Sequence, residues 1–130
     1  MNIIGGDKRG SKLALCASKA VRPTAQRTRE ALFNILQGGR FSLSLSEATV
    51  IDLFAGTGAI GLEALSRGAR SCVFVEQDQD ALQTLQANIS KLKLENCAHI
   101  LAKDARQIHT WPGPRADLVF ADPPYNSSLA

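Results

Sequence analysis

Four short apolar segments, separated by segments of helical character, constrain the fold of this chain more than any other feature of its sequence. Strands that are apolar almost throughout are typical of a parallel sheet buried on both faces, whereas half-exposed sheets alternate apolar and polar residues. The predicted strands are TVIDLFA, SCVFVE, AHILAKD and ADLVFAD, at residues 49–55, 71–76, 98–104 and 116–122. Helices are expected between them at residues 59–68 and 80–94, with a short helix or loop at 105–111. The sequence therefore predicts an α/β fold.

The residues before the first strand predict a short hairpin followed by a helix. Residues 2–4 and 11–15 carry apolar side chains on either side of a glycine-rich turn, which is typical of a hairpin. Residues 22–36 have helical spacing, with Thr24 as a candidate N-cap and two glycines beyond the end. The apolar stripe of this helix is expected to comprise Ala31, Leu32, Ile35 and Leu36.

Basic residues are concentrated in the amino-terminal part of the chain. Residues 1–40 hold eight basic and two acidic side chains, a net charge of +6, whereas the overall net charge is only +3. We therefore divide the chain into a basic arm, residues 1–40, and a core, residues 41–130. A basic arm on a mildly acidic core favours a polyanionic partner such as nucleic acid, although a solvated tail explains the charge equally well.

The composition favours a cytoplasmic protein without disulfides or metal. No apolar run reaches the ~18 residues that span a bilayer, and the amino terminus lacks the apolar region of a signal peptide. Cys16, Cys72 and Cys97 form no C-x-x-C pair, which favours reduced thiols. His99 and His109 have no partner at ligand spacing, so no metal site is expected.

A glycine-rich turn follows the first predicted strand. Gly56, Gly58 and Gly61 have the spacing G-x-G-x-x-G, which lets the backbone approach a ligand closely and is also typical of dinucleotide sites. Gly61 lies on the following helix, where we expect it to permit close packing. Asp52 precedes the turn, and a carboxylate there suits a cationic aminoacyl group better than a pyrophosphate.

Acidic residues end all four predicted strands, and the carboxyl ends of parallel strands share one edge of the sheet. These residues are Asp52, Glu76, Asp104 and Asp122. Glu76 can accept hydrogen bonds from both ribose hydroxyls of an adenosine. Asp104 can accept one from an adenine amino group, while the Ala105 N–H can meet a ring nitrogen. A site for adenosine and a positive charge, without phosphate, describes S-adenosylmethionine.

The predicted cofactor site extends along the strand ends to neighbouring residues. Its full set is Asp52, Phe54, Ala55, Gly56, Thr57, Gly58, Glu76, Gln77, Asp104, Ala105 and Asp122. The fourth strand ends in the sequence DPPY, residues 122–125. Because two prolines cannot continue a central strand, we expect either a simple strand stop or a rigid turn that presents Asp122 to a ligand at this edge.

These motifs together resemble a known family. The core is similar to the Rossmann-like class I methyltransferases, many of which share the GTG loop and the DPPY turn. The arm sequences IIGGDKRGSKL and RPTAQRTREALFN, followed by DLFAGTGAIGLEALSRGA, resemble the bacterial 16S ribosomal RNA guanine-N2 methyltransferases over nearly all 130 residues. The resemblance implies a mostly parallel sheet with flanking helices, preceded by a β-hairpin and a helix. The family's seven-stranded sheet normally continues through three further strands, so we expect this chain to lack the last strands.

The resemblance also implies a reaction, methyl transfer from S-adenosylmethionine to the exocyclic N2 of a guanine in 16S rRNA of the small ribosomal subunit. Asp122 and the Pro123 carbonyl would accept hydrogen bonds from the two N–H groups of the amine and so turn its lone pair toward the methyl group. Pro124 would hold the turn rigid, and Tyr125 would stack on the extruded base.

The arm would then contact RNA phosphates, for which planar guanidinium groups are well suited. The candidates are Arg9, Arg22, Arg27 and Arg29. At least one of these arginines could instead pair with Glu30 or with a carboxylate of the core.

Other functions also agree with the sequence. The same DPPY turn could serve methylation of adenine N6 in DNA or RNA, or of a protein glutamine. A chain without the last strands could bind S-adenosylmethionine or RNA without turnover. A NAD-dependent dehydrogenase would account for the glycines and Glu76, but it would leave DPPY unexplained.

Overall fold

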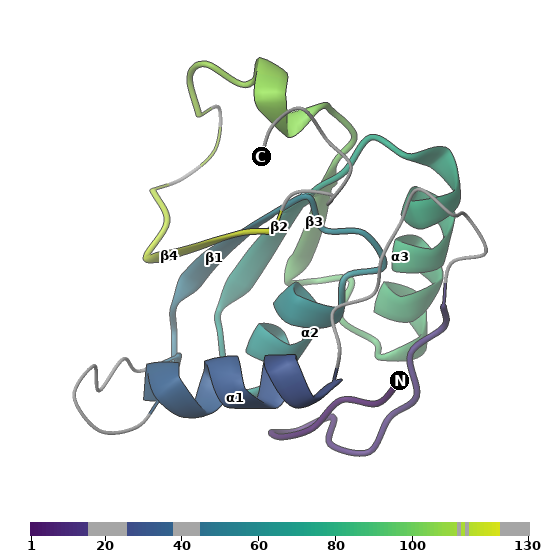
Figure 1. The fold of residues 1–130 in the computed structure, drawn as a ribbon, viewed down its shortest axis with the longest axis vertical. Coiled ribbons are helices and arrows are strands. Elements are labelled where there is room, and N and C mark those ends of the chain that lie inside the picture. The colour runs from purple at the N-terminus through teal and green to yellow at the C-terminus, as the bar shows by residue number, and fades with distance from the viewer. Residues whose placement is uncertain (16–25, 38–44, 112, 114, 123–130) are drawn as a thin grey trace.

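The fold is an alternation of strands and helices that begins after one amino-terminal helix (Figure 1). The computed structural model describes residues 1–15, 26–37, 45–111, 113 and 115–122. The elements are α1 (Gln26–Gln37), β1 (Thr49–Leu53), α2 (Ala59–Ser66), β2 (Ser71–Val75), α3 (Gln79–Lys91), β3 (Ala98–Leu101), the 3-10 turn η1 (Ala105–Gln107) and β4 (Leu118–Ala121). None of the helices in these ranges is long and apolar enough to cross a membrane.

The four strands form one parallel sheet in the order β3-β2-β1-β4. β1 lies inside the sheet, paired with β2 on one side and with β4 on the other (Figure 1). The strand order reverses at β1, and open α/β sheets bind their ligands beyond the carboxyl ends of the strands at such a switch point. The predicted α/β fold with a parallel sheet is confirmed.

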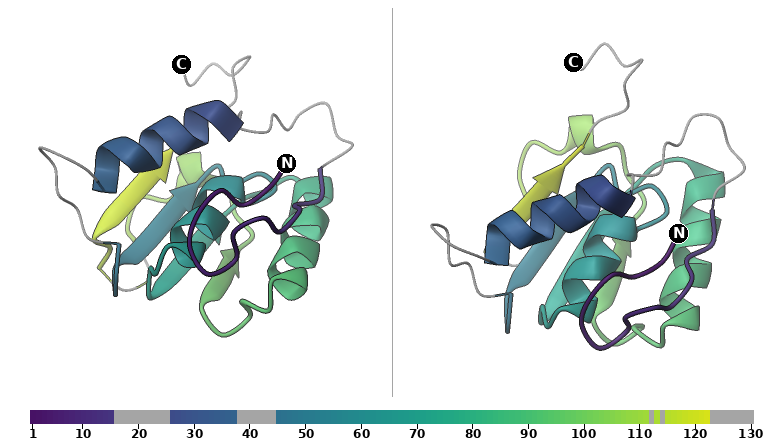
Figure 2. Two further views of the ribbon diagram at one scale, coloured as in Figure 1. Left: turned by 90° about the horizontal axis from the view of Figure 1, so that it is seen from below. Right: turned by 60° about the horizontal axis from the view of Figure 1, so that its bottom comes forward.

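The helices α1, α2 and α3 lie together on one face of the sheet, with α2 between the other two (Figure 2). Every residue of α2 is buried. A Cβ atom on Gly61 would lie 2.3 Å from Phe74 Cε1 and 2.8 Å from Cys72 Sγ, both on β2. The glycine therefore lets α2 approach the sheet closely, as its position in the sequence predicts.

Residues 1–15 cross the outer side of α2 and end beside α3 (Figure 2). Their two halves run antiparallel, joined by a single bridge between Asn2 and Lys12 and by a 2.9 Å hydrogen bond from Ile3 N to Ser11 O. Ile3 and Leu13 are 2% and 4% exposed. The predicted hairpin is confirmed in this reduced form. Its packing into the core shows that residues 1–15 are not a solvated tail.

Helix α1 turns a different face to the core than its apolar pattern predicts. Its buried residues are Arg29 and Phe33, four positions apart and hence on one face. Phe33 meets Phe120 of β4 with ring centroids 5.7 Å apart. Two residues of the predicted stripe, Ala31 and Ile35, are exposed, and the other two are half-buried. The prediction failed because it placed Arg29 on the solvent face. The candidate N-cap Thr24 lies outside the described residues.

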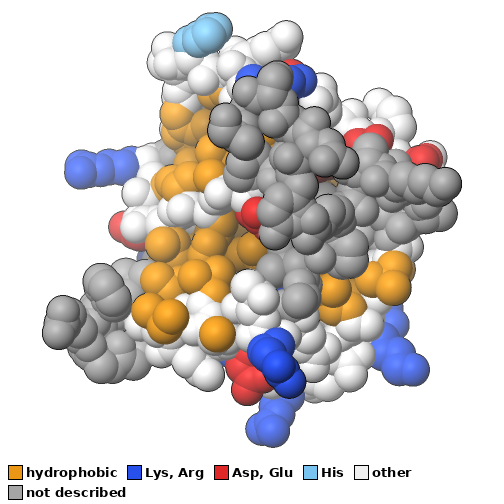
Figure 3. All heavy atoms as spheres, viewed as in Figure 1, with side chains coloured by type: hydrophobic (Ala, Val, Ile, Leu, Met, Phe, Trp, Pro, Cys, Tyr) orange, Lys and Arg blue, Asp and Glu red, His pale blue; other side chains and the backbone are white. Residues whose placement is uncertain are grey.

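An apolar area surrounds β4 on the surface of the molecule. Hydrophobic side chains gather there and on the neighbouring part of α1 (Figure 3). Val119 of β4 is 51% exposed and Ile35 of α1 is 57% exposed. The described residues therefore cover the apolar side chains of β4 only in part.

Candidate active site

The loop that joins β1 to α2, residues 54–58, has an unusual backbone. Phe54, Gly56 and Gly58 all have positive φ, at 57°, 60° and 91°. Glycine adopts this conformation readily, whereas for phenylalanine it is strained, and such strain is concentrated at functional sites. The Gly58 N–H donates to the Ala55 carbonyl at 2.9 Å, and the Ala55 N–H donates to the Val75 carbonyl at 3.0 Å. The loop thus forms a tight turn whose first part is bonded to the last residue of β2.

Glu76 holds this loop in place from the end of β2. Its Oε1 accepts from Gly56 N at 2.8 Å, and its Oε2 accepts from Gln77 N at 3.0 Å and from Asp78 N at 2.9 Å. A carboxylate offers about four acceptor positions, so these three bonds leave capacity for one further donor. Glu76 can therefore accept at least one ribose hydroxyl in this geometry, and its contact with both hydroxyls stays a prediction.

Asp52 lies within β1 rather than at its end, one position deeper in the sheet than predicted. Its side chain is 3% exposed, and its Oδ2 accepts from Gly61 N at 3.1 Å. Because the N-cap residue of α2, Gly58, has no side chain, Asp52 caps this helix from the sheet. Burial raises the pKa of Asp52 to about 7, opposed by the Gly61 hydrogen bond and reinforced by the carboxylates of Glu76 and Asp122.

Asp104 follows β3 and is already paired. Its Oδ1 accepts from Arg106 N at 3.0 Å, which caps the turn η1, and its Oδ2 lies 2.7 Å from Arg106 Nη2. These hydrogen bonds lower the pKa of Asp104. An adenine amino group must therefore share this carboxylate with Arg106 or displace it. Arg106 was not among the predicted site residues, although an arginine two positions after a capping acid can signal such a pair.

Asp122 directly follows β4, as Glu76 directly follows β2. Since both strands flank β1, these two acids lie on either side of the start of the loop at residues 54–58, the glycine loop. Both carboxylates raise the pKa of Asp52. Asp104 lies beyond the outer strand β3. The structure therefore brings three of the four acids together and places the fourth at the side. Three predicted residues of the turn, Pro123, Pro124 and Tyr125, lie outside the described residues.

The predicted RNA-binding arginines have different surroundings. Arg9 and Arg27 are exposed, and Arg22 lies outside the described residues. Arg29 is 0% exposed and pairs with Glu63 of α2 at 3.4 Å. The prediction that Arg29 contacts RNA is therefore wrong. Instead, it is the arginine that pairs with a carboxylate of the core.

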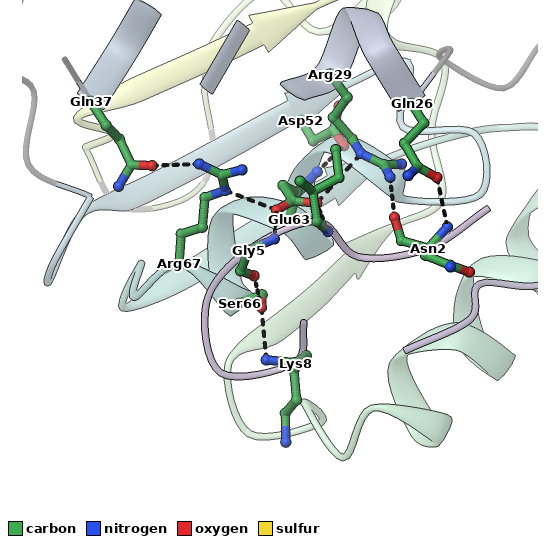
Figure 4. A network of polar contacts seen from close by, with 12 residues as sticks. Asn2, Gly5, Lys8, Gln26, Arg29, Gln37, Asp52, Glu63, Ser66 and Arg67 are labelled. Atoms are coloured by element: carbon green, nitrogen blue, oxygen red, sulfur yellow. Dashed lines mark hydrogen bonds and ion pairs between the residues drawn. The ribbon is translucent and has the colours of Figure 1, made fainter. Parts of the chain in front are cut away.

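Glu63 is the centre of a buried network that joins the first residues of the arm, the arm's helix α1, and α2 (Figure 4). Its carboxylate accepts from Ile4 N and Gly5 N, both at 2.9 Å, and from Arg67 Nε at 2.8 Å. Arg29 adds the ion pair with Glu63 and donates a hydrogen bond to the Asn2 carbonyl. Burial lowers the pKa of Arg29, whereas the carboxylate of Glu63 acts in the opposite direction. This network was not among the predictions from the sequence, although a single acid in a largely apolar helix can signal a buried partner.

A parallel sheet with this strand order, a glycine loop after β1 and acidic residues at the carboxyl edge form a Rossmann-like fold, and the solved structures that it matches identify this fold as that of the class I methyltransferases. In agreement, a solved structure described as a putative methyltransferase, yhhF, from Escherichia coli superposes with a TM-score of 0.81 at 37% identity, over 95% of this chain and 64% of that one. The family described as Conserved hypothetical protein 95 matches residues 1–130, and the chain belongs to that family.

Named relatives share most of the sequence. The chain is 37% identical to the putative rRNA methyltransferase YlbH of Bacillus subtilis, over 96% of this chain and 67% of the relative. It is 40% identical to ribosomal RNA small subunit methyltransferase D of Escherichia coli K12, over 99% of this chain and 62% of the relative. The chain thus spans about two thirds of the length of the curated relatives it matches.

Proposed function

We propose that this chain forms the cofactor-binding part of an S-adenosylmethionine-dependent methyltransferase that acts on the exocyclic N2 of a guanine in 16S rRNA. The observation that carries the proposal is the group formed by Asp52, Glu76 and Asp122 around a glycine loop at the switch point of the sheet. Membership of a family whose relatives are named as rRNA methyltransferases supports this substrate class.

The residues around the loop fit S-adenosylmethionine. Glu76 has one acceptor position left for a ribose hydroxyl, and the buried Asp52 can accept the positively charged aminoacyl group. Asp104 and Ala105 would receive the adenine. When bound, this cofactor supplies an electrophilic methyl group. In the part of the chain that the structure describes, no group of three His, Cys, Asp or Glu side chains lies where it could hold a metal ion.

Asp122 is the residue that we expect to meet the reacting amine. The lone pair of an exocyclic base amine is delocalised into the ring, so the amine needs to be oriented before it can attack. Asp122 and the Pro123 carbonyl would accept hydrogen bonds from its two N–H groups. Pro124 would keep the turn rigid, and Tyr125 would stack on the base. Orientation and electrostatics would then provide most of the catalysis.

The exposed arginines of the arm support an RNA substrate. Arg9 and Arg27 are available for phosphates, and Arg22 stays a prediction. We place the enzyme in the cytoplasm and its guanine in the assembled or assembling small ribosomal subunit.

The experiment is methyl transfer from labelled S-adenosylmethionine to naked 16S rRNA and to assembled small subunits, followed by nucleoside identification. N2-methylguanosine is expected, and N6-methyladenosine would contradict the proposed substrate. Asp122→Asn should lower turnover about 10²-fold or more while changing the dissociation constant of S-adenosylhomocysteine by less than about three-fold. Asp80→Asn, an exposed acid in the first turn of α3, is the matched control. Cofactor binding without methyl transfer would indicate a non-catalytic chain, and tighter binding of NAD would exclude a methyltransferase.

A further inference from the structure

Asn88 is a polar residue in the apolar stripe of α3. It is 1% exposed and lies among Ala81, Leu85 and Ile89, which are buried as well. Burying an amide is costly unless its donors and acceptor are all satisfied, so a buried asparagine at such a position requires specific partners.

The partners of Asn88 come from two distant parts of the chain. Its Oδ1 accepts from Ala14 N at 2.7 Å, and its Nδ2 donates to the Ala14 carbonyl at 3.3 Å. The same Nδ2 donates to the Thr57 carbonyl at 3.0 Å. One side chain therefore binds both backbone groups of an arm residue and one backbone group of the glycine loop.

Thr57 lies between the two glycines of the glycine loop, Gly56 and Gly58, and is 4% exposed. The loop is held on one side by Glu76, which binds Gly56 N, and on the other by Asn88, which binds the Thr57 carbonyl. Helix α3 also sets the space beside the loop, because a Cβ atom on Gly58 would lie 2.4 Å from Leu85 Cδ1. The position of the loop thus depends on α3 as well as on the strands.

We infer that Asn88 is a positioning residue that fixes the glycine loop through Thr57 and couples its geometry to the attachment of the arm at Ala14. The inference rests on the proposed function, because it takes the glycine loop as the cofactor site. The arm then has a second role besides RNA contact. When the arm detaches at Ala14, Asn88 loses two of its three hydrogen bonds and holds the loop less firmly, so cofactor affinity falls.

The test compares Asn88→Ala with Ser66→Ala. Ser66 Oγ also binds the arm, accepting from Lys8 N at 2.9 Å and donating to the Gly5 carbonyl at 2.6 Å, but it does not contact the glycine loop. Calorimetry with S-adenosylhomocysteine should show about ten-fold weaker binding for Asn88→Ala. It should show a change within about two-fold for Ser66→Ala. Equal losses in the two variants, or no loss for Asn88→Ala, would overturn the inference.

A second variant and a ligand-free measurement complete the test. If Asn88→Ala does not fold, Ala14→Pro serves instead, because it removes the backbone N–H with which the exposed Ala14 binds Asn88. This variant should still bind S-adenosylhomocysteine more weakly, and unchanged binding would overturn the coupling. Amide hydrogen exchange without ligand should accelerate at both Ala14 and Gly58 in Asn88→Ala. Acceleration at Ala14 alone would show that Asn88 does not position the loop. If the wild-type chain does not bind S-adenosylhomocysteine, the proposed function fails, while the exchange data still decide the role of Asn88.

Discussion

Replacing Glu63 by glutamine tests whether the network between the arm and α2 depends on a buried charge. Glu63 is 0% exposed, with Ile4 N and Arg29 facing one carboxylate oxygen and Gly5 N and Arg67 facing the other. Glutamine has nearly the same volume, but one of these oxygens becomes an NH2 group. Whichever way the amide is turned, that NH2 faces two donors. The buried guanidinium of Arg29 also loses its counter-charge.

The expected cost follows from the burial of the pair. Removing one partner of a buried ion pair costs about 3–5 kcal/mol, because the remaining charge is left uncompensated. The free energy of unfolding of a single domain is about 5–15 kcal/mol, so this change removes a large part of it. With a urea m-value of about 2 kcal/mol per molar, the unfolding midpoint should fall by about 2 M.

Urea unfolding followed by circular dichroism at pH 7 measures this change. The matched control is Glu47→Gln, since Glu47 pairs with Arg70 at 2.7 Å although the two side chains are 71% and 67% exposed. Such an exposed pair contributes about 0–1 kcal/mol. If Glu63→Gln lowers the free energy of unfolding no more than Glu47→Gln does, the network does not depend on a buried charge. The double variant Arg29→Met/Glu63→Gln should lose less free energy of unfolding than the two single variants together, because the uncompensated charge of Arg29 is then removed.

Three further predictions concern the carboxyl edge and the helix behind it. Because the pKa of Asp52 rises to about 7 from its ordinary 3.8, the folded chain keeps a proton between these values that the unfolded chain loses. The stability of the wild-type chain should therefore fall as pH rises through this window. Asp52→Asn should reduce the difference between the thermal unfolding temperatures measured at pH 5 and pH 8, and an unchanged difference would contradict this. Gly61→Ala should cost about 1–3 kcal/mol, since its Cβ would lie 2.3 Å from Phe74 Cε1, and Phe74→Leu should recover part of the loss in the same thermal assay. Arg106→Ala frees the carboxylate of Asp104 and should tighten S-adenosylhomocysteine binding about two- to five-fold in calorimetry, whereas weaker binding would mean that Arg106 orients Asp104 for the adenine.

The strands and the core helices could be predicted because their signals are local. Each apolar segment is long enough to fill one strand, and Glu76 and Asp122 directly follow their strands as predicted, whereas Asp52 lies inside β1. The close-packing role of Gly61 was also predictable from its position on the helix after the loop. The inward face of α1 was not, since one buried arginine shifts it from Ile35 toward Phe33.

The α/β fold and the parallel sheet could be predicted from apolar runs and helical periodicity along the chain, as could the positions of Glu76 and Asp122 directly after β2 and β4. The partners of the buried polar groups, in contrast, depend on contacts between distant parts of the chain. Arg29 meets Glu63, and Asn88 meets Ala14 across 74 positions of the chain. A charged or amide group can be buried when another part of the chain supplies its counter-charge or hydrogen bonds. Which part does so is a property of the packed layers and is not encoded in any local pattern.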